Sequence, residues 1–262
     1  MGSIIERIKK LTLWRYLCQL TSTVIISLPF FPAMRQFCVP AFHCHSCPWS
    51  MFACPIGVIA NFAQIRLFPF ITVGILGLVG TFGGRIICGW VCPFGLLQDL
   101  LGKITRAKVR IPYVLTYTKY AVLIGLVLLV PYSFPASDYR FCRLCPAGTL
   151  ESTIPRAFLG EVTTFGFNFF LRIAILAGVL LLAIISTRGF CRTLCPLGAI
   201  FSIFNKFSVF RLKVTHPKCH AGCTACAKVC PVQIHPVKQL NDAECIRCLD
   251  CTATDHIKLG TG

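Results

Sequence analysis

The residues best suited to chemistry in this sequence are its eighteen cysteines, in a chain of 262 residues. The motif Cys-Pro-x-Gly occurs four times, as ACPIG, VCPFG, LCPAG and LCPLG. In two copies another cysteine stands four residues before the motif's own, which pairs Cys88 with Cys92 and Cys191 with Cys195. Thiolates are the preferred ligands of soft metals and of iron–sulfur clusters. The repetition therefore predicts cofactor ligation rather than cysteines that only fill space.

The duplicated CxxxCPxG motif predicts one cluster shared between its two copies. A cubane [4Fe-4S] cluster needs four thiolates, and each copy supplies two. Proline after a ligand removes a backbone donor and fixes φ, and the glycine permits a close backbone approach or a positive φ. Two alternatives stay open. The four thiols could be small buried hydrophobes near helix ends, or they could form two redox-active dithiols.

A second group of cysteines lies in the segments HCHSCPWSMFACPIG and FCRLCPAG. These segments offer five thiols for the four positions of a cluster. A cluster would use Cys47, Cys54, Cys142 and Cys145, with Cys44 as the substitute. Disulfides are the alternative, because we place these segments on the oxidising outer face of a membrane.

The C-terminal tail carries a two-cluster ferredoxin pattern. From Cys219 the spacing is C-x3-C-x2-C-x3-C-P, followed by C-x2-C-x2-C-x3-D. In such runs the fourth cysteine ligates the other cluster. One predicted [4Fe-4S] ligand set is therefore Cys230, Cys245, Cys248 and Cys251, and the other is Cys219, Cys223 and Cys226 with Asp255 in the fourth position.

Asp255 departs from the usual ferredoxin pattern. A carboxylate is a harder ligand than a thiolate. This corner is therefore expected to be labile, aspartate-ligated, or empty as in a [3Fe-4S] cluster. A zinc module built from C-x2-C pairs is the alternative for the tail.

The elements that must position these motifs are apolar helices. The chain is 55% hydrophobic and 13% charged, with a mean hydropathy of +0.73, whereas soluble domains carry about 25% charged residues. A transmembrane helix needs about 20 mostly apolar residues. Four spans are expected, at about 16–33, 67–84, 120–137 and 166–187.

The basic residues predict how these spans are oriented. The formal net charge is +17, and a basic excess at the ends of membrane helices is commoner than nucleic-acid binding as its cause. Twenty lysines and arginines fall on the side of the two termini and five on the other. The positive-inside rule then places both termini in the cytoplasm of a multi-pass protein of the prokaryotic cytoplasmic (inner) membrane. The N-terminal apolar run is interpreted as an anchor, not a cleaved signal.

Under this topology the CPxG motifs alternate between the outer and inner faces. Residues 16–95 and 120–198 then form two copies of one unit. The predicted fold is an α-helical membrane protein with four transmembrane helices in two pseudo-symmetric halves, followed by a small C-terminal α+β two-cluster ferredoxin-like domain. The expected boundary separates a membrane domain at 1–214 from a cytoplasmic domain at 215–262.

The stretches GRIICGWVCPFG and GFCRTLCPLGA, with the ferredoxin-like tail, resemble the NapH-type membrane polyferredoxins, which are related to NosR and CcoG. The resemblance covers most of the chain and maps the paired motif onto Cys88, Cys92, Cys191 and Cys195. It implies a four-span protein that oxidises quinol and passes electrons to extracytoplasmic carriers. Other proteins of similar sequence act in cofactor maturation or regulation.

The expected function is that of an iron–sulfur electron-transfer subunit of a quinol dehydrogenase-type complex. It would move electrons between the quinone pool or a cytoplasmic donor and an extracytoplasmic redox protein, such as a cytochrome or an iron–sulfur subunit. The alternative is a redox sensor or cofactor-maturation protein that uses its clusters or outer thiols. Arg172 is a weak candidate for quinone binding, because a charge within a span is often functional, although it can also snorkel outward. Membrane lipid and other membrane-complex subunits are the remaining expected partners, and nucleic acid is not one.

Overall fold

Apolar runs and Cys-Pro steps divide the chain into many helices and one short sheet. The computed structural model describes residues 2–28, 37–47, 49–105, 109–135, 137, 139–160, 166–215, 225–237, 239–254 and 256–261. Its elements are α1 (Gly2–Ser27), α2 (Pro55–Gln64), α3 (Phe70–Gly83), α4 (Ile86–Trp90), α5 (Pro93–Leu101), η2 (Tyr113–Tyr117), α6 (Thr118–Val122), η3 (Leu123–Leu129), α7 (Val130–Ser133), α8 (Phe141–Leu144), α9 (Pro146–Gly148), η4 (Thr149–Thr153), α10 (Ile154–Phe158), α11 (Phe167–Ile185), α12 (Gly189–Thr193), α13 (Pro196–Phe204), β1 (Phe210–Val214), α14 (Ala225–Val229), η5 (Asp250–Thr254) and β2 (Ile257–Thr261).

Two helical runs among the described residues are apolar and long enough to cross a membrane. They are Tyr113–Ser133, which joins η2, α6, η3 and α7, and α11. They coincide with the expected spans at 120–137 and 166–187. In the expected span at 67–84, α3 has 14 residues, fewer than the ~20 that a hydrocarbon core requires. The fold is therefore mostly helical with two membrane-length apolar helices.

The first expected span differs most from its prediction. Helix α1 has 26 residues and begins at Gly2, well before residue 16, so the basic residues that precede the apolar run are themselves helical. It ends at Ser27, and the rest of the expected span, from residue 29 to residue 33, lies outside the described residues.

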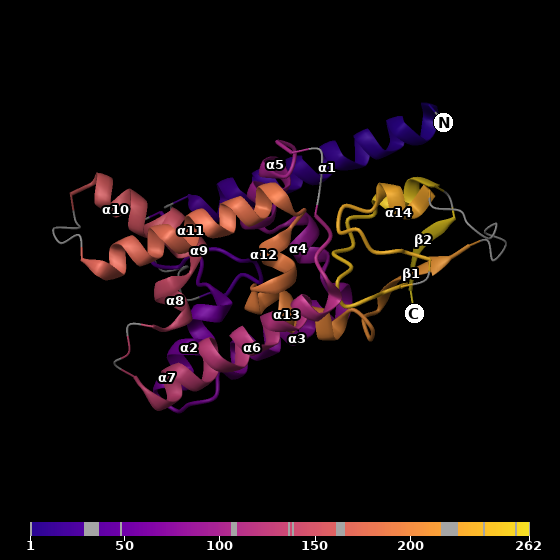
Figure 1. The fold of residues 1–262 in the computed structure, drawn as a ribbon. Helices are drawn as coiled ribbons and strands as arrows, with labels where there is room; N and C mark the ends of the chain where they lie inside the picture. The colour runs from indigo at the N-terminus through magenta and orange to yellow at the C-terminus, as the bar shows by residue number, and fades with distance from the viewer. Residues whose placement is uncertain are drawn as a thin grey trace.

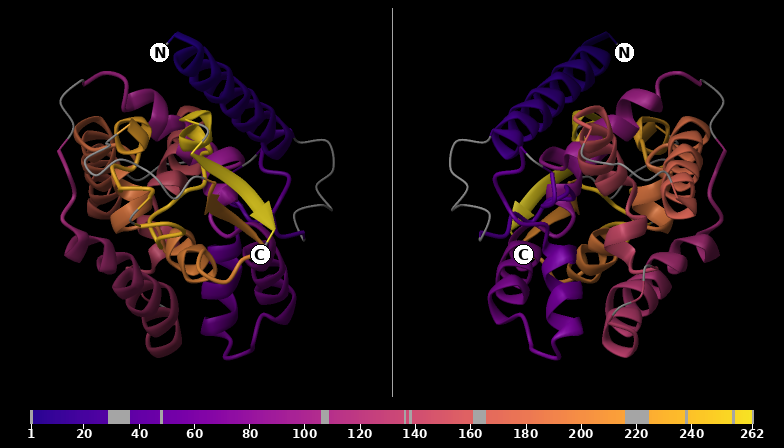
Figure 2. Two further views of the ribbon diagram at one scale, coloured as in Figure 1. Left: turned by 90° about the vertical axis from the view of Figure 1, so that its right-hand side faces the viewer. Right: turned by 90° about the vertical axis from the view of Figure 1, so that its left-hand side faces the viewer.

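The long helices α1 and α11 extend along the length of the molecule (Figure 1), with β1, β2 and α14 at one end and α2, α7 and α10 at the other. In the two views along that direction, helices occupy the periphery and α1 lies on one flank (Figure 2). Strand β1 pairs antiparallel with β2, from Phe210 opposite Thr261 to Val214 opposite Ile257. The C-terminus is thereby joined to the segment that directly follows α13.

The two copies of CxxxCPxG fold alike. In each copy a helix of five residues carries the first cysteine, and a helix of nine residues begins at the proline. Proline is favoured at the first helical position, because its fixed φ suits the helix and its missing N–H is not needed there. The duplication seen in the sequence is therefore also a duplication of local structure.

One hydrophobic core connects the two faces of the molecule. It includes Cys54 and Cys145 from the outer motifs and Cys88, Cys92 and Cys195 from the inner motifs. The rings of Phe42, Phe94, Phe141 and Phe190 meet among them, with centroids 5.1 to 6.3 Å apart. These five cysteines thus lie within the core rather than on the surface.

Candidate iron–sulfur sites

Each of the four CPxG motifs places its cysteine at the N-terminus of a helix. Cys54, Cys92, Cys145 and Cys195 are the N-cap residues of α2, α5, α9 and α13, with φ between −73° and −64° and ψ between 113° and 125°. This extended conformation is the one that a following proline favours. In the last motif, Sγ of Cys195 also accepts a hydrogen bond from the Gly198 N–H at 3.4 Å. Such N–H···S bonds favour a charged thiolate.

The inner quartet consists of Cys88, Cys92, Cys191 and Cys195, which are all buried. These thiols interact electrostatically with one another, because each lies in the field of the others across the two halves. Burial raises the pKa of the Cys92 thiol to about 12. Iron must therefore displace the proton on binding, as it does at thiolate sites generally.

Two arginines cross between the halves at this quartet. Arg188, three residues before Cys191, donates from Nη1 to the carbonyl oxygen of Cys88. Arg85, three residues before Cys88, donates from Nη2 to the carbonyl oxygen of Cys191 at 2.9 Å. Each half thus holds the first cysteine loop of the other half in place.

The inner glycines leave room that a side chain would fill. A Cβ on Gly198 would lie 2.9 Å from the Cys191 carbonyl oxygen and 3.1 Å from Nη2 of Arg85. A Cβ on Gly95 would lie 3.0 Å from the Cys88 carbonyl oxygen. Gly95 and Gly198 do not have a positive φ. The need for glycine at these positions therefore comes from the close approach of the carbonyl oxygens of Cys88 and Cys191, and not from backbone conformation.

Buried charge around the inner quartet suits an anionic cluster. Arg188 makes a bidentate pair with Asp99, at 2.7 and 2.6 Å. Asp99 also faces Arg15, which donates to Asp250 at 2.9 Å. Glu244 pairs with a second set of buried cations: Arg85, Lys119 and Arg192.

In these two networks five buried cations face three carboxylates. Simple charge counting gives about −2 for an oxidised four-iron cluster with four thiolates, which would offset the excess. Nε of Arg85 has no hydrogen-bond partner among the described residues, although this arginine lies in the field of Cys88, Cys191 and Cys195. Gln98 adds a donor, since its Nε2 lies 3.0 Å from Sγ of Cys191. The residues present therefore fit a [4Fe-4S] cluster.

The outer quartet that the structure brings together is Cys44, Cys54, Cys142 and Cys145. These four line one small cavity and interact electrostatically with one another. Cys47 is buried but does not line this cavity. The structure thus groups Cys44 with the other three, whereas the sequence analysis gave Cys47 the first place.

Two polar side chains brace the outer quartet. Glu151 accepts a hydrogen bond from the Cys44 N–H at 2.6 Å, and burial raises the pKa of its carboxyl group to about 7. The ring nitrogens of the buried His43 lie 3.1 and 2.9 Å from the carbonyl oxygens of Ala41 and Phe52. The loop that precedes Cys44 is therefore held from both sides.

The tail quartet consists of Cys230, Cys245, Cys248 and Cys251, which line one pocket together with Val232 and Ile234. This is the set that the spacing assigned to the first tail cluster. Cys226 is also buried, and its Sγ lies 3.2 Å from the Thr254 hydroxyl. Its predicted co-ligands Cys219, Cys223 and Asp255 lie outside the described residues.

The two charge networks connect the tail to the inner quartet. Glu244 directly precedes Cys245, and Asp250 directly precedes Cys251. Glu244 pairs with Arg85, which lies three residues before Cys88. Asp250 pairs with Arg15, which also faces the Asp99–Arg188 pair beside the inner cysteines. The sequence analysis did not single out Arg85, Arg188, Asp99 or Glu244. One sequence feature could have identified the two arginines: each stands three residues before the first cysteine of a CxxxCP motif.

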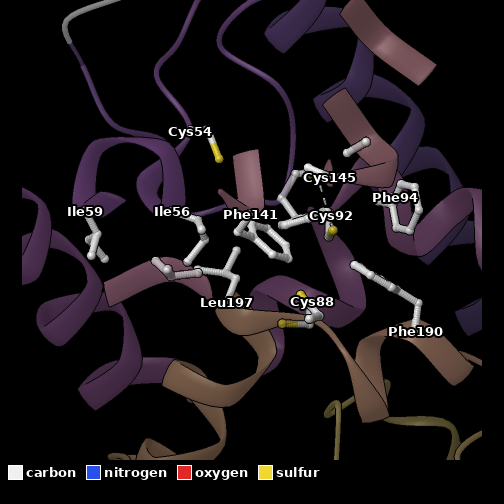
Figure 3. Packing of buried hydrophobic residues seen from close by; sticks show 14 of the residues in the cluster. Cys54, Ile56, Ile59, Cys88, Cys92, Phe94, Phe141, Cys145, Phe190 and Leu197 are labelled. Carbon is white, nitrogen blue, oxygen red and sulfur yellow. Dashed lines mark hydrogen bonds between the residues drawn. The ribbon is translucent and has the colours of Figure 1, made fainter. Parts of the chain in front are cut away.

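The outer loop reaches inward to the inner quartet. Sγ of Cys92 lies 3.9 Å from the carbonyl oxygen of Phe42, which precedes Cys44 by two residues. Figure 3 shows Cys54, Cys145, Cys92 and Cys88 in one continuous packing, with Phe141 and Leu197 among them. Two residues span at most ~7 Å. The outer and inner ligands are therefore separated by much less than the ~30 Å of a hydrocarbon core.

The remaining candidates lie apart from these quartets. Arg172 is half-buried on α11 and does not line the pocket of the outer quartet or that of the tail quartet. Among the described residues, no three His, Cys, Asp or Glu side chains converge on a point where one metal ion could be bound. In a cubane each thiolate binds a different iron, so its ligands stand farther apart than those of a single ion.

Comparison with known proteins agrees with this chemistry. Residues 65–112 and 168–215 each match a 4Fe-4S binding domain family, and each match contains one CxxxCPxG motif. The chain is 34% identical to the uncharacterized protein MJ0749 of Methanocaldococcus jannaschii over 71% of this chain and 68% of that protein. It is 36% identical to MJ0750 of the same organism, over 65% and 68% respectively. No solved structure matches the chain.

A third relative is much longer. The regulatory protein NosR of Stutzerimonas stutzeri is 32% identical over 66% of this chain but only 24% of NosR. The paired cysteine motifs and their helical frame define an iron–sulfur protein of the membrane-associated, ferredoxin-type electron-transfer class. The chain belongs to the same family as MJ0749 and MJ0750 and contains two matches to the 4Fe-4S binding domain.

Proposed function

We propose that the protein is a membrane-bound electron-transfer subunit that moves electrons through clusters on both sides of the membrane. The observation that carries this proposal is the inward reach of the outer loop, which brings the Phe42 carbonyl within 3.9 Å of the Cys92 sulfur. A shortened gap removes the need for one long electron-transfer step across the hydrocarbon core. The route would run between the tail quartet, the inner quartet and the outer quartet.

When bound, a [4Fe-4S] cluster accepts and returns one electron at a time. Cys88, Cys92, Cys191 and Cys195 would hold the inner cluster, while Arg85, Arg188 and Gln98 supply positive charge and an N–H donor around it. The Gly198 N–H, which donates to the Cys195 sulfur, would add a further donor to this cluster. The phenylalanine rings between the inner and outer quartets exclude water from the path.

The outer cluster would use Cys44, Cys54, Cys142 and Cys145, because these four thiols share one cavity. In the tail, one cluster would use Cys230, Cys245, Cys248 and Cys251. The second tail cluster is proposed from the sequence alone, with Cys219, Cys223 and Cys226 as ligands. Its fourth position would be bound by Asp255 or would lack an iron, as in a [3Fe-4S] cluster. The protein would then hold up to four clusters.

The proposed membrane arrangement has four spans and both termini in the cytoplasm. The runs Tyr113–Ser133 and α11 meet the length requirement, and α1 and α3 would complete the bundle. The quinone pool, an extracytoplasmic redox protein and other subunits of a membrane complex are the proposed partners. Protease treatment of right-side-out and inverted vesicles tests this arrangement, and cleavage of the tail in right-side-out vesicles would contradict it.

The electron-transfer proposal is tested on the full-length protein with quinol as donor. Oxidation of one quinol releases two electrons, which the clusters take singly, and two protons, which pass to solvent. We expect more than eight iron atoms per chain, which is the number that two tail clusters alone would hold, with a matching content of acid-labile sulfide. We also expect the EPR signals of the clusters to change rapidly when quinol is added. A Cys88→Ala, Cys191→Ala variant should lose one cluster's iron and keep the tail signals.

Two results would contradict the proposal. Iron content unchanged in the double variant would show that the inner cysteines are not ligands. Clusters that stay oxidised with quinol, together with disulfides among the outer cysteines, would favour the sensing or maturation role instead.

A further inference from the structure

The duplicated architecture contains two grooves whose walls include corresponding positions of the two repeats. The first is lined by α2, α3, η3 and α13, with Ile59 and Ile200 on its walls. The second is lined by α1, α5 and η4, with Leu150 and Leu97 at the corresponding positions after their CPxG motifs. Their volumes are about 560 and 290 Å³, the smaller being close to the lower end of typical ligand pockets, about 300 Å³.

The two grooves differ in chemistry. The position that is Ala60 after the first outer CPxG motif is Glu151 after the second, and Glu151 lines the second groove. The hydroxyl-bearing residues Thr23 and Ser27 line it as well, opposite leucines of α5. The first groove has no carboxylate, and its charged residue is Arg66, which lies over the Tyr132 ring at 5.0 Å.

The second groove also touches both cysteine sets. His43, which precedes Cys44, lines it at the outer end. Pro93 and Phe94, which follow Cys92, line it at the inner end. A molecule in this groove would therefore contact residues adjacent to an outer ligand and to an inner ligand.

We infer that the groove between α1, α5 and η4 binds the ring of a lipid-soluble quinone. A neutral ring with two oxygens suits an apolar slot that ends in a carboxyl group and hydroxyls, and its apolar tail can leave between the helices. A phospholipid headgroup fits less well, because its phosphate would meet the Glu151 carboxylate. This inference rests on the proposed electron-transfer function and assigns the quinone contact to Glu151, Thr23 and Leu97 rather than to Arg172.

The test labels the full-length, cluster-containing protein with a short-tailed azidobenzoquinone and locates the label by mass spectrometry. We expect label on α1 or α5, displaced by excess decylubiquinone. Leu97→Phe narrows the groove and should reduce specific labelling about tenfold, which corresponds to about 1.4 kcal/mol of binding free energy. Ile200→Phe makes the matched change in the other groove and should leave labelling unchanged. Glu151→Gln, which keeps an acceptor for the Cys44 N–H, should weaken labelling.

Each other outcome would overturn the assignment. Label confined to Leu67–Leu76 or Tyr132 would place the quinone in the first groove. Label displaced by phospholipid but not by decylubiquinone would identify a lipid groove. Iron content and the EPR signals after reduction with dithionite are measured on the same samples. These two readouts depend on the clusters and not on the groove. Normal values with misplaced label would therefore reject the quinone site without rejecting the electron-transfer proposal.

Discussion

At the scale of single residues, the inner glycines are present because of space. Gly198→Ala would place a Cβ 2.9 Å from the Cys191 carbonyl oxygen, so the Cys191 loop or α13 must move. Overpacking of this kind costs about 1–3 kcal/mol. We expect the variant to lose iron at the inner site, measured as iron per chain and by EPR. Gly178→Ala is the control, because its Cβ would meet nothing within 4 Å, and equal iron loss in both variants would contradict the explanation.

Gln98 provides a second prediction at this scale. Its N–H donor stabilises negative charge on the Cys191 sulfur, and reduction adds negative charge to a cluster. Gln98→Met should therefore make the inner cluster's potential more negative by roughly 40 mV, from about 1 kcal/mol for one hydrogen bond and 59 mV per tenfold for one electron. An EPR redox titration measures this shift. Gln19→Met removes a nearby bond to the Gly89 carbonyl oxygen and should shift the potential less.

Residue spacing grouped Cys88 and Cys92 with Cys191 and Cys195, and Cys230 with Cys245, Cys248 and Cys251, because covalent spacing within a motif restricts which thiols can meet. The structure brings the same thiols near one another, while their role as ligands stays a prediction. It could not choose between Cys44 and Cys47, since the irregular loop around them obeys no helical or strand period. The arginines that cross between the halves were also missed. Nothing in a sequence states which carbonyl oxygen an arginine will reach across two separate helices.

At the scale of elements, buried ion pairs fasten the tail to the inner helices. Glu244→Ala would leave Arg85 and Lys119 buried without their carboxylate, and breaking a buried pair costs about 3–5 kcal/mol. We expect a lower thermal midpoint and faster proteolytic release of the tail. Glu6→Gln on the exposed side of α1 is the control and should change stability by less than about 0.5 kcal/mol. Equal behaviour of the two variants would show that the pairs do not hold the tail.

Helix type and approximate position followed from hydropathy, but helix ends did not. Hydropathy placed the first span at 16–33, yet the helix starts at Gly2, because arginine and lysine are good helix formers whatever their hydropathy. The helical run that corresponds to the expected span at 120–137 begins at Tyr113, because the polar residues before residue 120 are also helical. Lys119 is buried within that run by pairing with Glu244 of the tail, a partner more than a hundred residues away.

At the scale of the whole molecule, the clusters are expected to stabilise the fold as well as carry electrons. Five cations face three carboxylates in the buried networks, so removing an anionic cluster leaves like charges to repel one another at low dielectric. Iron removal by chelation under reducing conditions should increase hydrogen exchange at α4 and α12. Exchange that increases only in the tail pockets would contradict a structural role for the inner cluster.

The exchange of arginines between halves has a consequence for biogenesis. During synthesis, Cys88 and Cys92 emerge long before Arg188 and the second pair of thiols. A cluster held by all four inner cysteines could therefore be completed only after both repeats have been synthesised. Until then the thiols of the first repeat would lack half of their proposed co-ligands.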